Sequence, residues 1–157
     1  MIDAELERRI NHLHNRYLRV IDDDRLEEWP LLFLPDGNYV LTTRENHARD
    51  LPLALMACQG RGMMQDRVMG MRKINVFEPH RYHHQVSGME AEQTAHGIRC
   101  VSGFLVIRTM HTGAASVFAT GVYLDVLKED NDGELRFAER KVITDSRQTD
   151  TLLVIPL

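Results

Sequence analysis

The stretch from Ile98 to Asp145, IRCVSGFLVIRTMHTGAASVFATGVYLDVLKEDNDGELRFAERKVITD, decides the fold of this chain. It is dense in Val, Ile, Phe, Tyr and Thr, the residues that suit a pleated and half-buried surface. Turn signals at Thr112-Gly113 and Asn131-Asp132-Gly133 divide it into three runs. Because the connections are short, the sequence predicts three consecutive antiparallel strands.

The first of these runs is apolar on both sides. Leu105 and Ile107 fall on one face of the predicted strand, and Phe104 and Val106 fall on the other. A sheet of this kind needs cover on both faces, so we expect helices on one face and something else on the second.

The rest of the chain supplies helices first and strands afterwards. Apolar residues recur at helical spacing over 2–23, and the sequence predicts a second short helix over 25–33 and an imperfect, glycine-interrupted helix over 53–72. Strands are expected over 38–43 and 81–94, with a polar loop over 44–52. This order predicts an α+β domain that spans residues 1–157, with helices on one face of a curved antiparallel sheet.

Composition excludes several classes of protein. The 157 residues carry a formal net charge of −4 with both signs mixed along the chain, which argues against nucleic acid and membrane surfaces as partners. The charged start MIDAELERRI is not a signal peptide. Cys58 and Cys100 lie in apolar surroundings, which favours reduced, buried thiols in a cytoplasmic protein.

The familiar catalytic motifs are missing. Gly60-Arg61-Gly62 lacks the third glycine of a dinucleotide site. His83 and His84 would point to opposite faces of a strand, so a metal site in this histidine cluster is not expected. A stand-alone pocket enzyme, an isomerase or dehydratase, is the enzymatic alternative, with His84 and Asp66, or Asp125 and Tyr123, as its acid–base pair.

Charged residues also interrupt runs that otherwise look buried. Arginine is favoured in buried and interfacial ion pairs because its planar fork binds carboxylates through two hydrogen bonds. The pattern therefore leaves two alternatives open, ion pairs inside the domain or contacts with another subunit. The apolar ending TDTLLVIPL must pack against the domain or a partner. The interrupting residues are Arg67, Arg81, Arg108, Asp125, Arg140 and Asp145.

Six short motifs, in order along the whole chain, resemble the small (β) subunits of aromatic-ring-hydroxylating dioxygenases. At Gly103 the family commonly has Asn. The motifs are Trp29-x-x-Leu32-Phe33 with Asp36 and Tyr39; Asp66-Arg67-Val68 before Arg72; Arg81-Tyr82-x-His84-x-Val86-Ser87-Gly88; Phe104-Leu105-Val106-x-Arg108; Phe118-Ala119-x-Gly121-x-Tyr123-x-Asp125; and Arg140 to Ser146.

The resemblance implies a cone-like, nuclear-transport-factor or cystatin-like α+β domain in an α3β3 hexamer. It places a Rieske [2Fe–2S] centre and a mononuclear Fe(II) in the large subunit, with electrons from NAD(P)H through a separate reductase. Neither cysteine is followed by His at a Rieske spacing, so we expect this chain to be a non-catalytic, structural subunit without cofactors. The expected interface residues are Arg67, Arg81, His84, Arg108, Arg140 and Leu157.

The resemblance also carries an expectation about the substrate. The turn at residues 110–113 and the ending are most like those of family members that act on terephthalate. The expected substrate is thus an aromatic carboxylate, with terephthalate as the first choice and salicylate, anthranilate or benzoate as further ones.

Overall fold

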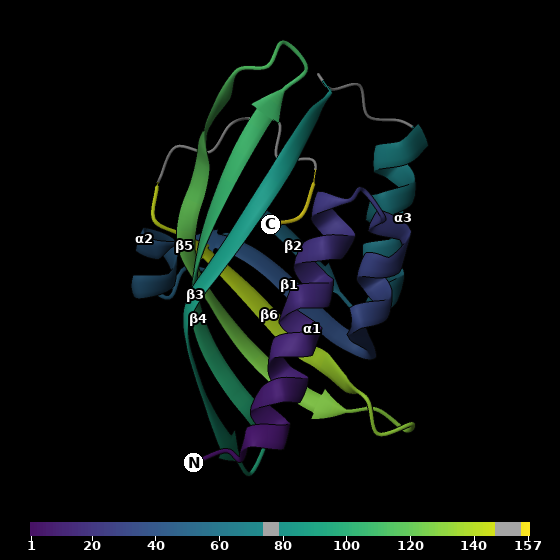
Figure 1. Ribbon diagram of the computed structural model, residues 1–157, viewed down its shortest axis with the longest axis vertical. Helices are drawn as coiled ribbons and strands as arrows, with labels where there is room; N and C mark the ends of the chain where they lie inside the picture. Colours follow the sequence, from purple (N-terminus) through teal and green to yellow (C-terminus); the bar gives the residue numbers. More distant parts are fainter. Residues whose placement is uncertain (74–78, 147–154) are drawn as a thin grey trace.

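A computed structural model describes residues 1–73, 79–146 and 155–157 (Figure 1). Its helical elements are α1 (Ala4–Asp22), the 3-10 helix η1 (Leu26–Leu32), α2 (Arg44–Ala48) and α3 (Arg61–Lys73). Its strands are β1 (Phe33–Thr43), β2 (Met56–Gln59), β3 (His80–Thr94), β4 (Gly97–Met110), β5 (Ala115–Glu129) and β6 (Leu135–Thr144). None of the helices in these ranges is long and apolar enough to cross a membrane.

The strands form one curved sheet in the order β2-β1-β6-β5-β4-β3. The stretch from Ile98 to Asp145 supplies β4, β5 and β6 as three antiparallel neighbours, which confirms the first prediction. The sheet as a whole is mixed, however, because β1 pairs with β6 in parallel. The expectation of an antiparallel sheet is wrong at this one ladder. Residues 44–134 separate the two strands, which is ample chain for the crossover that parallel pairing requires.

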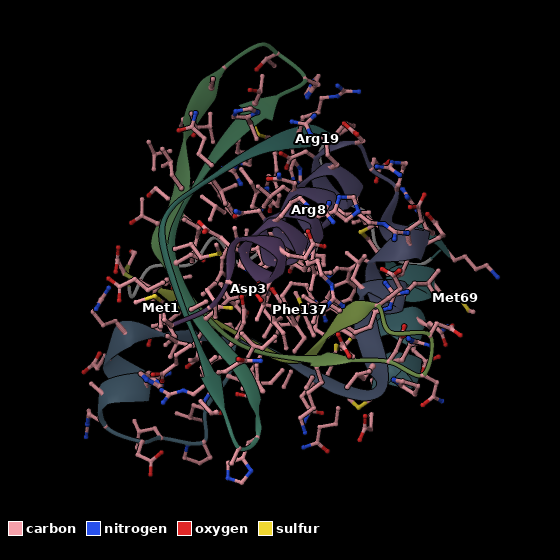
Figure 2. The ribbon with its side chains drawn as sticks, turned by 60° about the horizontal axis from the view of Figure 1, so that its bottom comes forward. Met1, Asp3, Arg8, Arg19, Met69 and Phe137 are labelled. Atoms are coloured by element: carbon pink, nitrogen blue, oxygen red, sulfur yellow. The ribbon has the colours of Figure 1, made fainter. Side chains whose placement is uncertain are left out.

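Helix α1 confirms the clearest helical pattern in the sequence. The Asp3 carboxylate accepts a hydrogen bond from the Leu6 N–H at 2.7 Å and so caps the first turn. The apolar stripe that includes Ile10, Tyr17 and Ile21 is buried. Figure 2 looks nearly along α1 and shows the sheet curving round the helix, with Phe137 beside it. The helix therefore fills the concave side of the sheet.

The segment from residue 53 to 72 departs from its predicted helix. Residues Met56 to Gln59 form β2, which adds an edge strand to β1, and the helix begins only at Arg61. Gly60 lies between them with a φ of 85°, a conformation that favours glycine. The main-chain N–H and C=O groups on the open edge of β1 pair with residues 56–59. The spacing of apolar residues over 53–72 carries no information about this pairing.

Two further boundaries differ from the predictions. Strand β1 starts at Phe33 rather than 38, with an irregularity between Phe33 and Asn38 that absorbs the predicted turn. The polar loop over 44–52 contains the short helix α2, whose start is capped by the Thr43 hydroxyl accepting from the Asn46 N–H at 3.2 Å.

The two faces of the sheet have different environments. On β4 the side chains of Cys100, Phe104 and Val106 are buried towards α1. The opposite face is apolar and partly open, with Val101 43% and Val117 65% exposed. Helix α1 thus covers the concave face of the sheet, and the outer face of β4 and β5 is partly open in the described part of the chain.

Candidate functional site

A buried ion pair lies at the centre of the domain. Asp125 on β5 and Arg140 on β6 are directly opposed in the ladder. The guanidinium donates from Nε to Oδ1 at 2.8 Å and from Nη2 to Oδ2 at 2.7 Å. The two residues are 3% and 1% exposed. Arg140 thus belongs to an internal ion pair, which was one of the two alternatives left open by the sequence.

Aromatic rings surround the Arg140 guanidinium. Its central carbon lies 4.1 Å from the ring centre of Tyr17, 4.0 Å from that of Tyr123 and 4.3 Å from that of Phe137. A cation over ring faces is attracted by their quadrupoles, most strongly where water is excluded. This cage compensates part of the cost of taking the charge out of water.

His14 on α1 adds a third titratable group to the pair. Its Nε2 lies 3.3 Å from Asp125 Oδ2. Burial lowers the pKa of His14, and the nearby Arg140 charge lowers it further. Burial by itself raises the pKa of Asp125, but the Arg140 charge and hydrogen bonds outweigh it and hold that pKa below its ordinary value. The cluster therefore contains an ionised Asp125–Arg140 pair and a neutral imidazole.

A second pair joins the end of α1 to the edge strand β3. His84 Nδ1 lies 2.6 Å from Asp22 Oδ1, and the His84 main-chain N–H donates to Asp22 Oδ2 at 2.9 Å. The His84 side chain is 0% exposed and that of Asp22 is 6% exposed. The carboxylate partner of His84 is thus Asp22 and not Asp66, which is exposed on α3. The other suggested pair also differs, because Asp125 is engaged by Arg140 and not by Tyr123.

The last described residues enter the same interior. The Tyr17 hydroxyl donates to the Leu157 carbonyl oxygen at 2.7 Å, and the Tyr39 hydroxyl donates to it at 3.1 Å. The Leu157 N–H donates in turn to the Tyr39 oxygen at 3.0 Å. Ile155 and Leu157 are both buried in the main core. Residues 155–157 of the apolar ending therefore pack against this domain, whereas residues 149–154 of that ending lie outside the described residues.

The expected interface residues separate into two groups. His84, Arg140 and Leu157 are buried inside the domain, which corrects the expectation that their side chains face a partner. Each has an internal partner that the sequence could not identify. Arg81 is exposed on β3, whereas Arg67 and Arg108 are half-buried. The Arg108 guanidinium lies 4.7 Å from the ring centre of Phe118.

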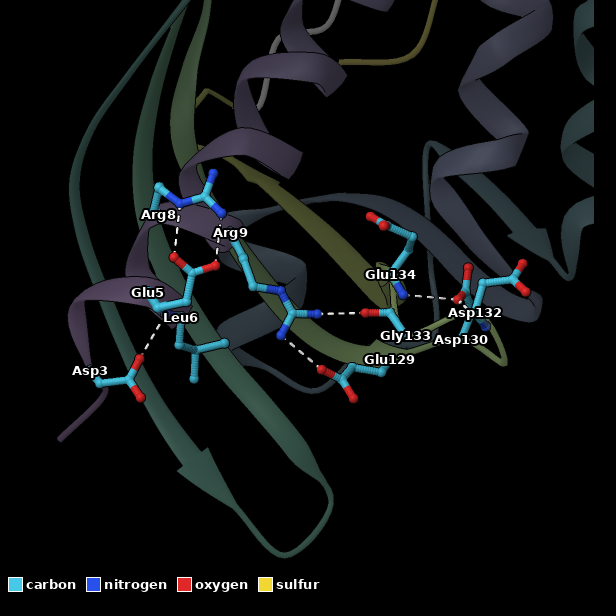
Figure 3. A network of polar contacts seen from close by, with 10 residues as sticks. All are labelled: Asp3, Glu5, Leu6, Arg8, Arg9, Glu129, Asp130, Asp132, Gly133 and Glu134. Carbon is cyan, nitrogen blue, oxygen red and sulfur yellow. Dashed lines mark hydrogen bonds and ion pairs between the residues drawn. The ribbon is translucent and has the colours of Figure 1, made fainter.

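One end of the cone is closed by a network of charged side chains (Figure 3). Arg9 on α1 donates to Glu129 Oε1 at 2.8 Å and to the Gly133 carbonyl at 2.6 Å, which ties the helix to the turn between β5 and β6. A cleft of about 450 Å³ lies beside it, and its walls carry charges of both signs. In the described ranges, no group of three or more His, Cys, Asp or Glu side chains is placed to hold a metal ion.

Sequence reasoning missed several members of these clusters. It did not single out His14, and it did not connect Tyr17, Asp22 or Tyr39 with the polar partners that the structure gives them. Helical periodicity does mark Tyr17 as buried. No local signal links Asp22 to His84, 62 positions away, or Tyr39 to Leu157, 118 positions away.

Comparisons with known proteins agree with this architecture. Residues 16–150 match the family model described as ring hydroxylating beta subunit. The chain is 38% identical over 143 residues to terephthalate 1,2-dioxygenase, terminal oxygenase component subunit beta 1, of Comamonas sp., which covers 90% of this chain and 92% of the relative. It is 36% identical over 146 residues to the anthranilate 1,2-dioxygenase small subunit of Burkholderia cepacia, covering 92% and 90% of the two chains.

A solved structure supports the same assignment. It is described as the "beta subunit of a putative aromatic-ring-hydroxylating dioxygenase" from Novosphingobium aromaticivorans, and it superposes with a TM-score of 0.85 at 32% identity over 94% of each chain. The beta subunit of the benzoate 1,2-dioxygenase from Burkholderia mallei shares the fold, with a TM-score of 0.72 at 15% identity over 92% of each chain. The chain therefore belongs to the family of ring-hydroxylating dioxygenase beta subunits.

Proposed function

We propose that this chain is the non-catalytic small subunit of a multicomponent Rieske non-haem iron dioxygenase, and that it holds the large catalytic subunits in an α3β3 assembly. One observation carries the proposal. The carboxylates of Asp22 and Asp125 and the hydroxyls of Tyr17 and Tyr39 are engaged by contacts within the domain, while an apolar face of the sheet is partly open to solvent. These interior polar groups are therefore withdrawn from a substrate, and the apolar outer face of the sheet has the character of a subunit interface.

The sequestered groups argue against the stand-alone pocket enzyme. A general base must come within hydrogen-bond reach of the proton that it removes. The His84 side chain is fully buried, and both oxygens of Asp22 already accept hydrogen bonds from His84. Both oxygens of Asp125 are bound by Arg140. Both carboxylates are thus already engaged by partners within the domain.

The open face of the sheet has the composition of a protein contact. Contiguous exposed apolar surface on a soluble chain marks a site of association. Val101 pairs across the ladder with Leu124, and Ile107 pairs with Val117, so the apolar side chains form one patch. The exposed Arg81 lies on the neighbouring strand β3. The outer-face patch consists of Val101, Leu105, Ile107, Val117, Val122, Leu124 and Val126.

The redox groups of the proposed complex belong to the large subunit. A Rieske cluster is bound by two thiolates and two histidines. Burial raises the pKa of both cysteine thiols, that of Cys100 to about 12, and neither cysteine is followed by His at the spacing of a Rieske ligand pair. The Rieske centre and mononuclear Fe(II) would therefore lie in the large subunit and receive electrons from NAD(P)H through a reductase.

The proposed substrate is an aromatic carboxylate. Both relatives are named for enzymes of such compounds, terephthalate and anthranilate. Terephthalate is the first choice because that relative is 38% identical. The residues that select the substrate would lie in the large subunit.

The test is co-expression of this chain with the large subunit of a ring-hydroxylating dioxygenase. Val101→Glu and Arg81→Glu change exposed side chains, so the isolated chain should keep its melting temperature. The complex should dissociate, which gel filtration with light scattering detects as a loss of mass. Arg16→Glu, at an exposed position on α1, is the matched control and should leave the complex intact. If both test variants assemble like the parent chain, the outer face is not the interface. If the chain alone converts a small carbonyl compound, the pocket-enzyme alternative is correct.

A further inference from the structure

Gly103 lies in the middle of the outer-face patch. On β4 it stands between Val101 and Leu105, and in the two ladders it faces Ser87 of β3 on one side and Val122 of β5 on the other. Its two neighbours along the chain are buried, so a side chain at position 103 would point outward. The glycine therefore leaves the main chain of β4 bare in the middle of an apolar surface.

The domain itself gives no reason for a glycine at this position. Gly103 does not have the left-handed φ that favours glycine, so its backbone would accept another residue. Among the described residues, the first atom that a Cβ at Gly103 would meet is Ser87 Oγ at 3.6 Å, which is an ordinary van der Waals contact. Glycine nevertheless weakens a strand, because it loses more conformational entropy on folding than any other residue.

Nearby glycines show what a reason inside the domain looks like. On β5, a Cβ at Gly121 would run into the Ile143 carbonyl. At the irregularity in β3 that follows Ser87, Gly88 has a φ of 62° and so supplies the left-handed residue of the bulge. Neither reason applies at Gly103. A strand glycine of this kind often marks a place where another molecule approaches the main chain closely.

The surroundings of Gly103 have the anatomy of an interface centre. Apolar side chains flank it on β4 and β5, and charged side chains border the patch on both sides. The bordering residues are Glu90 and Glu92 on β3 and Glu139 and Lys141 on β6. Specific interfaces have an apolar core and a polar rim, and the residues with the largest binding energies gather near the centre. Gly103 occupies that central position.

We propose that Gly103 is the point of closest contact with the large subunit, where a bulky apolar side chain of that subunit packs on the main chain of β4 between Val101, Leu105 and Val122. Strand β4 is paired on both sides, so this contact offers apolar packing rather than main-chain hydrogen bonds. The large subunit is the occupant because small subunits of dioxygenases assemble with large ones. The inference rests on the proposed assembly function and deepens it by naming the position that the partner must fit.

Two substitutions in the full chain test the Gly103 contact, in co-expression with the large subunit that assembles with the parent chain. Gly103→Leu should abolish assembly in gel filtration with light scattering, while the isolated chain keeps its melting temperature because the new side chain points to solvent. Gly103→Ala adds one methyl group and should weaken the complex about tenfold or more, because overpacking a close contact is destabilising. Gly70→Leu and Gly70→Ala, on α3 and outside the patch, are the matched controls and should assemble like the parent.

Val101→Glu separates the Gly103 contact from the interface as a whole. If Val101→Glu dissociates the complex while both Gly103 variants assemble like the parent, the outer face is the interface and this inference alone is wrong. If Val101→Glu also leaves the complex intact, the proposed interface fails and the Gly103 contact fails with it.

Gly103→Ala decides the question if Gly103→Leu lowers the melting temperature of the isolated chain. A weaker complex formed by a Gly103→Ala chain of unchanged melting temperature supports the contact, and unchanged assembly overturns it. If Gly103→Ala also lowers the melting temperature of the isolated chain, the domain itself requires the glycine and the proposal is wrong.

Discussion

Removal of the Asp125 carboxylate isolates a buried cation, and its effect can be worked out from the structure. Asp125→Ala deletes both acceptors of the Arg140 guanidinium and leaves that group 1% exposed. Arginine does not lose its proton in proteins, so the charge cannot be neutralised. Loss of one partner of a buried pair costs about 3–5 kcal/mol. The three rings around the guanidinium still attract it, which places our expectation near the lower end, about 3 kcal/mol.

Urea unfolding of the isolated chain measures this cost. Asp125→Ala should lower the free energy of unfolding by about 3 kcal/mol. The double variant Asp125→Leu with Arg140→Met replaces the pair with apolar side chains and should cost much less than either charge deletion alone. The reasoning is refuted if Asp125→Ala costs under about 1 kcal/mol, or if the effects of the two positions simply add.

Further predictions concern His14 and Tyr17 in the same core and two glycines. Burial lowers the pKa of His14 from 6.5, so below that pH the unfolded chain binds a proton that the folded chain does not. The free energy of unfolding should therefore be at its full value above pH 6.5 and fall below it. His14→Gln should flatten this acid part of a plot of the urea midpoint against pH. Burial raises the pKa of Tyr17 from 10.0 to about 12, so its contribution should be lost as pH rises through that range, and Tyr17→Phe should reduce the alkaline loss. Gly121→Ala would place a Cβ against the Ile143 carbonyl and should lower the free energy of unfolding, measured by thermal unfolding, by at least about 2 kcal/mol. At Gly70 a Cβ meets nothing within 4 Å, so Gly70→Ala should stabilise α3 by up to about 1 kcal/mol.

The elements with strong periodic patterns could be predicted, and those defined by distant pairing could not. Helix α1 and strands β4, β5 and β6 follow the sequence predictions closely, because their own side chains carry the period of the structure. Strand β2 was predicted as helix because its four residues are too few to show a period. It forms because β1, already paired with β6, presents a second open edge.

The candidate site shows the same division at the level of single residues. Asp125 and Arg140 stand out in the sequence as charged residues within predicted strands, and His84 stands out as a member of a histidine cluster. Their partners do not stand out. The choice between an internal ion pair and an interface depended on which side chain lies across the ladder, and the register placed Asp125 opposite Arg140.

The sequence by itself determined the fold class, the core strands, the family resemblance and the polar residues that needed an explanation. These properties depend on local side-chain chemistry and on motif order, which are written along the chain. Only the tertiary structure decided that Leu157 fills the cone, that Asp22 holds His84, and that β1 and β6 run in parallel. Each of these joins segments more than 60 positions apart, and such contacts are selected by the packing of the whole domain rather than by any local pattern.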